Sequence, residues 1–191
     1  MKRPRGRPPR AEAAVSRDDM VVAALDLLDN DGADALTMRA LAKRLGINPM
    51  TIHHHFGGRD GLIGAMSDAV YAQVKAVENA TPVDRIGELL KAYHGQVLRH
   101  PALTMLIFSR PTVFPQQAER ITNEISTLLA EVGLPGDRTA LWRDILVDFT
   151  HGSALAIAMS ARGLDCDPEE DQDFTMALTE LLTGLIRAPD R

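Results

Sequence analysis

Apolar residues recur along the chain at spacings of three and four positions, which is the pattern of helices that bury one face. The first helix is predicted over residues 17–30, and Ser16 with Asp19 predicts a capping box at its start. The core face of this helix is Met20, Ala24, Leu27 and Leu28. The last two helices are predicted over about 137–161 and 171–187. No stretch alternates apolar and polar residues as a strand does, so we expect an all-α fold of about nine helices.

Residues 35–62 predict two short helices separated by a tight turn. Thr37 can cap the first helix, and Gly46 supplies the turn. Asn48 and Pro49 are an N-cap and a first-turn proline, which together start the second helix. A helix-turn-helix that inserts its second helix into the DNA major groove has this form, and so has an ordinary helical hairpin. The spacing alone does not separate the two.

The composition fits a soluble cytoplasmic protein with a substantial apolar core. Of its 191 residues 45% are hydrophobic, and the longest nearly apolar run, residues 152–161, is too short to span a bilayer. The basic N-terminus is not followed by the apolar stretch of a signal peptide. The single cysteine, Cys166, rules out an internal disulfide framework, and its acidic neighbours argue against a redox sensor.

Positive charge is concentrated in the first ten residues, although the whole chain has a net charge of −5. This segment contains no acidic residue, and its basic residues are Lys2, Arg3, Arg5, Arg7 and Arg10. The run Arg5-Gly6-Arg7-Pro8 resembles the core of an AT-hook, an extended segment that lies in the minor groove of A·T-rich DNA. A basic tail that only adds attraction to phosphates is the alternative. Either way, the charge asymmetry indicates a nucleic-acid-binding end in an otherwise acidic chain.

The two-helix stretch also resembles the DNA-binding domain of the tetracycline-repressor (TetR) family of transcriptional regulators. The residues that carry the resemblance are Thr37, Leu41-Ala42, Leu45-Gly46, His53, His55-Phe56 and Arg59. His53 departs from the family, which usually has a phosphate-contacting tyrosine there, although a neutral imidazole can still donate one hydrogen bond. The resemblance implies a flexible basic arm over residues 1–15, a helix-turn-helix domain over 16–60, and a helical effector-binding and dimerisation domain over 61–191.

Candidate DNA contacts lie on the outer side of the two-helix stretch. In the second helix, expected over about residues 49–54, Ile52 and Phe56 should face inward and leave the other side chains available to base edges and phosphates. The family often uses the position of Arg39 for a contact, and a solvated helix face explains Lys43 nearly as well as a phosphate contact. The full set is Arg5, Arg7, Thr37, Arg39, Lys43, Asn48, Met50, Thr51, His53, His54 and Arg59.

We expect no metal, no cofactor and no enzymatic activity. The three consecutive histidines, residues 53–55, point about 100° apart on a helix and cannot share one ion. No cysteine or carboxylate lies three or four residues away to complete a site. The sequence contains no Gly-rich phosphate loop and no nucleophile with a nearby base. Asp148 and His151, three residues apart on a helix, are more simply a surface pair.

The resemblance implies an effector pocket between the fourth and eighth helices. Its candidate lining is Tyr93, His94, Met105, Phe108, Trp142, Phe149 and His151. Taken singly, each of these residues is also a reasonable core residue. Together they suit a largely apolar small molecule with one or two hydrogen-bonding groups. Tetracycline itself is not implied, because Leu106 and Ile107 stand near the position where that branch of the family has a magnesium-binding histidine.

The resemblance also implies a homodimer joined by a four-helix bundle of the last two helices. The penultimate helix is apolar nearly all round, so it must be covered on more than one face. The candidate interface is Gly152, Ala154, Ala158, Leu178, Leu182 and Leu185. A monomer that buries the same residues internally is the alternative.

These features lead to one main functional prediction. We expect a dimeric, ligand-responsive transcriptional regulator, a repressor that binds a palindromic double-stranded DNA operator and is released by a small molecule. An architectural DNA-binding protein that uses the basic arm without effector control is the second interpretation.

Overall fold

The computed structural model describes residues 15–110, 113, 115–160 and 168–187, and this part of the chain forms nine α-helices and no strand. The helices are α1 (Arg17–Asp31), α2 (Met38–Leu45), α3 (Pro49–Phe56), α4 (Arg59–Tyr71), α5 (Pro82–Arg99), α6 (Pro101–Phe108), α7 (Gln116–Glu131), α8 (Gly136–Met159) and α9 (Pro168–Arg187). The expected all-α fold is confirmed. Arg5, Arg7 and Cys166 lie outside the described residues. None of the described helices is long and apolar enough to cross a membrane.

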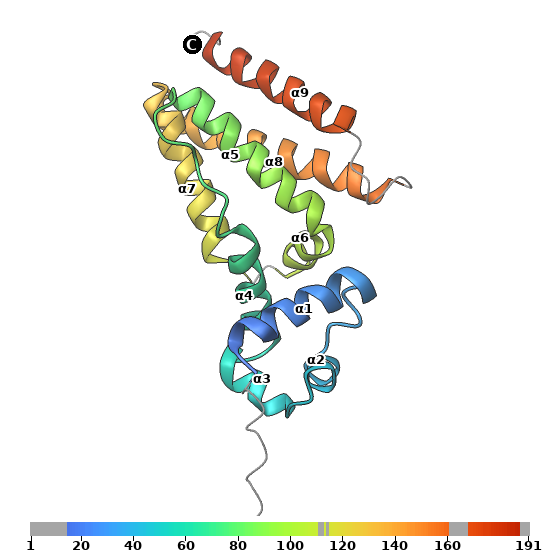
Figure 1. Cartoon of the computed structure of the whole chain (residues 1–191). Helices are drawn as coiled ribbons and strands as arrows, with labels where there is room; N and C mark the ends of the chain where they lie inside the picture. Colours follow the sequence, from blue (N-terminus) through green and yellow to red (C-terminus); the bar gives the residue numbers. More distant parts are fainter. Residues whose placement is uncertain (1–14, 111–112, 114, 161–167, 188–191) are drawn as a thin grey trace, which may run out of the picture.

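The helices form two groups joined by α4. Helices α1–α3 lie at one end of the molecule, and α5, α7, α8 and α9 lie at the other (Figure 1). Helix α4 leads from the first group into the second. Helix α6 packs against both α1 and α8, so it provides a second connection between the two groups.

Local capping explains where the first helices begin. At α1, the Ser16 hydroxyl accepts a hydrogen bond from the Asp19 amide at 3.1 Å, and the Asp19 carboxylate accepts one from the Ser16 amide at 2.9 Å. These two residues form the expected capping box, and the hydrogen bonds from Ser16 lower the pKa of Asp19. At α2, the Thr37 hydroxyl accepts from the Ala40 amide at 3.1 Å, as expected for an N-cap.

The turn between α2 and α3 has the geometry that the sequence predicts. Gly46 has a φ of 68°, which a residue with a side chain rarely adopts. The Ile47 amide donates to the Ala42 carbonyl at 3.0 Å and closes the end of α2. The Asn48 side chain then accepts from the Met50 amide at 2.8 Å and starts α3. Helix-turn-helix geometry is thus fixed by interactions within a few residues.

Three helix ends differ from the expected ones by two or more residues. Helix α3 continues two residues beyond 54, because Gly57, with a φ of 73°, supplies its left-handed C-cap. Helix α8 ends at Met159 rather than 161, because Ser160 is extended. Helix α9 begins at Pro168 rather than 171, since proline suits the first turn of a helix.

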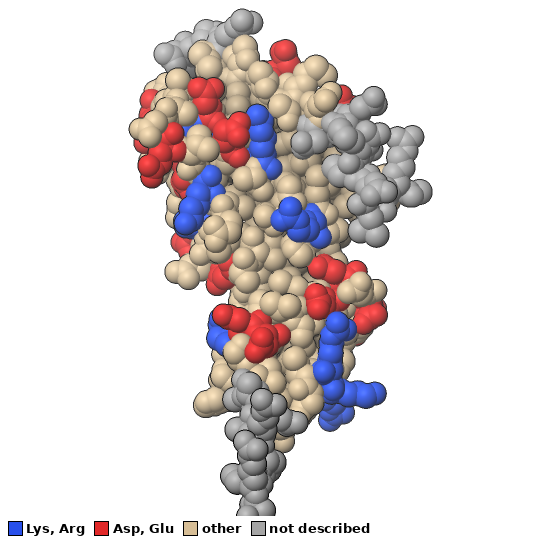
Figure 2. Space-filling view, in the orientation of Figure 1, with Lys and Arg blue, Asp and Glu red and all other residues tan. Residues whose placement is uncertain are grey.

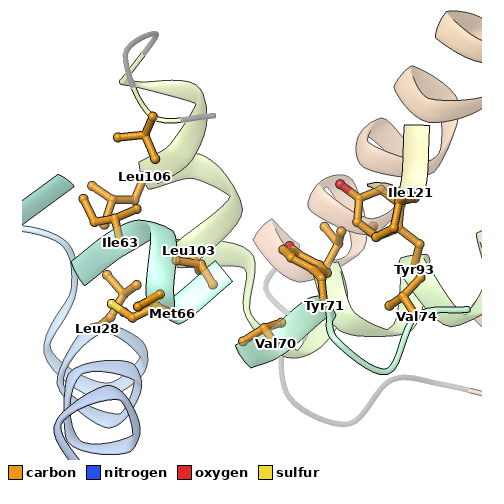
Figure 3. Close-up of a cluster of buried hydrophobic side chains, with 14 of the residues drawn as sticks. Leu28, Ile63, Met66, Val70, Tyr71, Val74, Tyr93, Leu103, Leu106 and Ile121 are labelled. Atoms are coloured by element: carbon orange, nitrogen blue, oxygen red, sulfur yellow. The ribbon is translucent and has the colours of Figure 1, made fainter. Parts of the chain in front are cut away.

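The core is continuous from one end of the molecule to the other. Figure 3 shows Leu28 of α1 beside Met66 of α4, and Tyr71, at the far end of α4, near Tyr93 of α5. The two tyrosine rings are 5.2 Å apart between centroids. Burial of each large apolar side chain contributes roughly 1.5–3 kcal/mol. Helix α4 therefore shares one packed core with both groups of helices.

Candidate functional site

The outer surface of α2 and α3 brings together most of the predicted DNA contacts. Ile52 and Phe56 are buried, as expected for the inner side of α3, whereas Met50 is 67% exposed. The other exposed candidates are Thr37, Arg39, Lys43, Asn48, His53 and His54. Thr51 is half-buried. These residues form a protruding surface with apolar, imidazole and cationic groups.

The charge of this surface suits a polyanion. Between residues 35 and 59 the chain has four basic residues and no acidic one. Arg44 lies 3.6 Å from Asp26 of α1, so its charge is partly offset. Among the described residues, Arg39 and Lys43 have no ion pair within 4 Å. Figure 2 shows basic side chains at the lower right of the molecule, while acidic side chains gather at the upper left.

Arg59, a predicted phosphate contact, also has a partner within the chain. Its guanidinium donates to the Ala33 carbonyl at 2.9 Å and is half-buried, so it joins the start of α4 to the α1–α2 loop. The Arg17 guanidinium lies over the Phe56 ring, 4.9 Å from its centroid, a contact that no sequence pattern predicted. Both arginines hold the three-helix unit together.

The caps at Thr37 and Asn48 use only part of each side chain. Each side-chain oxygen accepts from a backbone amide. The hydroxyl hydrogen of Thr37 and the amide hydrogens of Asn48 are not used in these caps, and both groups are exposed at the start of a helix. Both residues can therefore cap a helix and donate to a phosphate at the same time.

No group of three or more side chains that could hold a metal ion occurs among the described residues. The three histidines of α3 therefore do not form such a group. Their side chains are all exposed on the helix.

A cavity of about 410 Å³ lies between α4, α5, α6, α7 and α8. Its size is within the range of about 300–1,000 Å³ that small-molecule sites have. Tyr93, Phe108 and His151 line it, as predicted. Six further lining residues have apolar side chains, and these are Ile107, Val113, Pro115, Ala118, Ile121 and Val147.

Two hydrogen-bonded pairs form part of the cavity wall. The Tyr71 hydroxyl lies 3.0 Å from the Thr104 hydroxyl, and the Tyr93 hydroxyl lies 2.6 Å from His151 Nε2. Burial lowers the pKa of His151, and the nearby charge of Asp148 only partly opposes this effect. Burial also raises the pKa of Tyr93. At neutral pH both groups are therefore uncharged, and the hydrogen bond joins a tyrosine hydroxyl to a neutral imidazole.

Ser67 and Arg110 also line the cavity, and the sequence analysis missed both. The Ser67 hydroxyl is fully buried, and it has no hydrogen-bond partner among the described residues. Arg110 Nη1 lies 2.6 Å from Asp60 Oδ1, in the first turn of α4. For Ser67 a sequence signal was available. Helical spacing places it on the same side of α4 as Asp60 and Tyr71.

The other predicted pocket residues lie outside the cavity lining, which corrects the expectation. His94 stacks on Phe174 of α9 with ring centroids 3.7 Å apart, and Phe149 lies 5.4 Å from the same ring. These two residues therefore belong to the contact between α9 and the helices beneath it. Met105 is exposed and Trp142 is half-buried elsewhere on the surface.

The predicted dimer interface also needs correction. Ala154, Leu178, Leu182 and Leu185 are buried within this chain, because α9 packs its apolar side onto its own α5 and α8. Gly152 is exposed and Ala158 half-buried. The outward surfaces of α8 and α9 instead carry exposed apolar side chains, which are Leu141, Ile145, Met159, Met176 and Ile186.

Comparison with known proteins supports the interpretation of α1–α4 as a DNA-binding domain. Residues 21–66 match the model of the family described as bacterial regulatory proteins, tetR family. An HTH-type transcriptional regulator of Saccharopolyspora erythraea is 30% identical over 113 residues, which cover 58% of this chain and 48% of that protein. The chain thus spans about half the length of this curated relative.

Two solved structures share the fold. BioQ of Mycobacterium smegmatis has a TM-score of 0.76 at 21% identity, over 90% of this chain and 98% of that one. A TetR variant of Acinetobacter baumannii in complex with minocycline has a TM-score of 0.74 at 22% identity, over 92% and 99%. At these identities the likeness concerns the arrangement of the helices.

Proposed function

Because this chain belongs to the tetR family of bacterial regulatory proteins through residues 21–66, we propose that it is a homodimeric, sequence-specific DNA-binding transcriptional regulator. In this proposal it represses transcription from a palindromic operator and leaves the operator when a small, largely apolar ligand binds. Residues 16–60 are the DNA-binding domain, and residues 61–191 bind the effector and form the dimer. The observation that carries the proposal is the exposed, acid-free surface of α2 and α3, since both helices begin at side-chain caps that fix their geometry.

Different residues of this surface have different roles in the proposal. Met50 and Thr51 of α3 meet base edges in the major groove, where an apolar contact with a thymine methyl carries sequence information. Thr37 and Lys43 contact phosphates, which fix the register but not the sequence. Arg39 is the strongest candidate for a base contact, because it is exposed and has no ion pair among the described residues.

The exposed apolar side chains of α8 and α9 support the homodimer. Met159 is 74% exposed and Met176 is 63% exposed, although both lie on long, regular helices. Apolar surface of this kind on adjacent elements is typical of an interface. A two-fold pair would also present two copies of α3, as reading an inverted repeat requires.

The experiment that tests the proposal is selection of bound sequences from a random double-stranded DNA library by the full-length protein. We expect an enriched inverted repeat. The variant R39A should bind this repeat roughly ten- to a hundred-fold more weakly, since a good side-chain contact to a base is worth about 1–3 kcal/mol. The matched control is R99A, which removes an exposed arginine from α5.

Absence of an enriched inverted repeat would overturn the proposal. If the protein instead binds DNA without sequence preference, and if a variant lacking residues 1–10 loses that binding, an architectural DNA-binding protein would be the better description. R39A binding as tightly as R99A would remove Arg39 from the contact set.

A further inference from the structure

Arg110 connects the cavity to the DNA-binding end of the molecule. It lines the cavity and also holds Asp60 in the first turn of α4, with 2.6 Å between Nη1 and Oδ1. Its side chain is 30% exposed, so the ion pair is partly screened by solvent. A partly screened pair is one that a second carboxylate can replace at small cost, because the guanidinium can pair with either.

The remaining lining shows what kind of molecule would bring such a carboxylate. The walls are mostly apolar, and the buried Ser67 hydroxyl has no partner for its hydrogen among the described residues. The Ser67 hydroxyl of α4 and the Arg110 guanidinium of the segment after α6 both line the cavity, and both favour an acceptor with negative charge. The hydroxyls of Tyr71 and Tyr93 are already engaged in hydrogen bonds.

We propose that the cavity binds an apolar molecule with one carboxylate, and that this carboxylate takes Arg110 away from Asp60. The inference rests on the proposed function, because it describes how an effector of that regulator would act. It names the chemical class of the effector and the first contact that changes when the effector binds.

Asp148 is the feature that would favour a cationic ligand instead. Its carboxylate lines the cavity from α8, one turn before His151. It is exposed, and an exposed carboxylate is stable in water without a bound cation. Asp148 comes from α8 and Arg110 from the segment after α6, so the two charged groups are supplied by different elements of the lining.

The exchange would change how α4 is held. Asp60 directly follows Arg59, whose guanidinium holds the α1–α2 loop through the Ala33 carbonyl. A ligand that removes Arg110 from Asp60 therefore loosens the start of α4 beside the three-helix unit. In this proposal the DNA-bound form keeps the Arg110–Asp60 pair and the ligand-bound form does not, so ligand binding changes the affinity for DNA by linkage.

The test is calorimetric titration with matched probes that share an apolar body and differ in one group. The first set is decanoate, decanol and decylamine, and the second is naphthylacetate, naphthylethanol and naphthylethylamine. In at least one set we expect the acid to bind the wild-type protein more tightly than its alcohol and amine. The variant R110Q should weaken binding of that acid by at least about ten-fold, which is the usual size of a lost charge-assisted hydrogen bond.

The variant D60N separates exchange from structural damage. R110Q and D60N both break the same ion pair, so damage would lower acid binding in both. Exchange predicts opposite effects, because D60N leaves Arg110 available and strengthens acid binding. The control R85Q breaks the Arg85–Glu131 pair between α5 and α7, which does not line the cavity, and should bind the acid as the wild type does.

DNA binding by the same variants keeps the two proposals distinguishable. If wild-type protein binds an inverted repeat but no acid binds better than its alcohol and amine, the exchange is wrong and the regulator stands. If D60N weakens acid binding to the same extent as R110Q does, the exchange is also wrong. If neither the wild-type protein nor any variant binds an inverted repeat while the acid binds through Arg110, the proposed function fails and the carboxylate site remains.

Discussion

The buried Ser67 hydroxyl predicts that S67A is more stable than the wild-type protein. Ser67 lies inside α4, is fully buried and has no hydrogen-bond partner among the described residues. A buried hydroxyl without a partner costs roughly 1–3 kcal/mol. Alanine also favours a helix interior over serine by about 0.5 kcal/mol. Because Ser67 borders the cavity, removing one oxygen leaves no new sealed void.

We expect the free energy of unfolding to rise by about 1–2 kcal/mol, which is less than the sum of these contributions, since neighbouring groups partly compensate. For a chain of this length that corresponds to an increase in Tm of about 2–8 °C. Unfolding in urea and on heating, followed by circular dichroism at one fixed protein concentration, measures both quantities.

The matched control is S126A. Ser126 is half-buried inside α7, and its hydroxyl donates to the Thr122 carbonyl at 3.0 Å. S126A gains the same helix propensity but loses a satisfied hydrogen bond, so its stability should stay within about 0.5 kcal/mol of the wild type. If S67A is no more stable than S126A, the Ser67 hydroxyl has a partner in solution, and its role as an available donor in the cavity is refuted.

Three further predictions concern other parts of the molecule. T37A removes the cap of α2 and should lower the free energy of unfolding by about 1 kcal/mol in urea; an unchanged value would show that the cap is dispensable. Because burial holds the pKa of His151 below its unfolded value near 6.5, the unfolded state takes up its proton first as pH falls. The stability that the neutral imidazole provides is complete above about pH 7 and is lost as pH falls through about 6.5. H151Q should therefore lose less stability than the wild type between pH 7.5 and 5.5, and equal losses would contradict a lowered pKa of His151. L141E should shift the protein toward monomer in sedimentation velocity while V22E, at an exposed position of α1, should not; equal behaviour would place the dimer interface elsewhere.

The helix-turn-helix could be predicted from sequence because its signals are local. The Thr37 and Asn48 caps and the left-handed Gly46 each act within a few residues, and the structure has all three where the sequence predicts them. The inward direction of Ile52 follows from helical spacing in the same way. Interactions of this range are encoded in short patterns, so a single sequence is enough to find them.

The lining of the cavity and the exposed apolar surface of α8 and α9 could not be predicted as well. Helical periodicity indicates that one face of a helix is covered, but it does not indicate which residues cover it. Leu178 and Leu182 have the spacing of an interface, yet they pack onto α5 and α8 of their own chain. Arg110 and Asp60 are fifty positions apart, and no pattern in either segment indicates the other. The stacking of His94 on Phe174 is equally non-local, and it removes His94 from the cavity.

The contacts along α4 indicate how occupancy of the cavity can reach the DNA-binding end. The helix is joined to the α6–α7 region at its first turn by Arg110, in its middle by Asp68, which accepts from the Gln117 amide at 3.1 Å, and at its end by Arg120, which donates to the Tyr71 carbonyl at 3.4 Å. A helix held at three points along its length moves as one piece with α7 while these contacts last. Its inner side shares a packed core with α1, and packed cores resist gradual deformation. A shift of α7 around a ligand would therefore reorient the three-helix unit as a rigid body, and the Arg110 pair, the most exchangeable of these contacts, is where we expect that motion to begin.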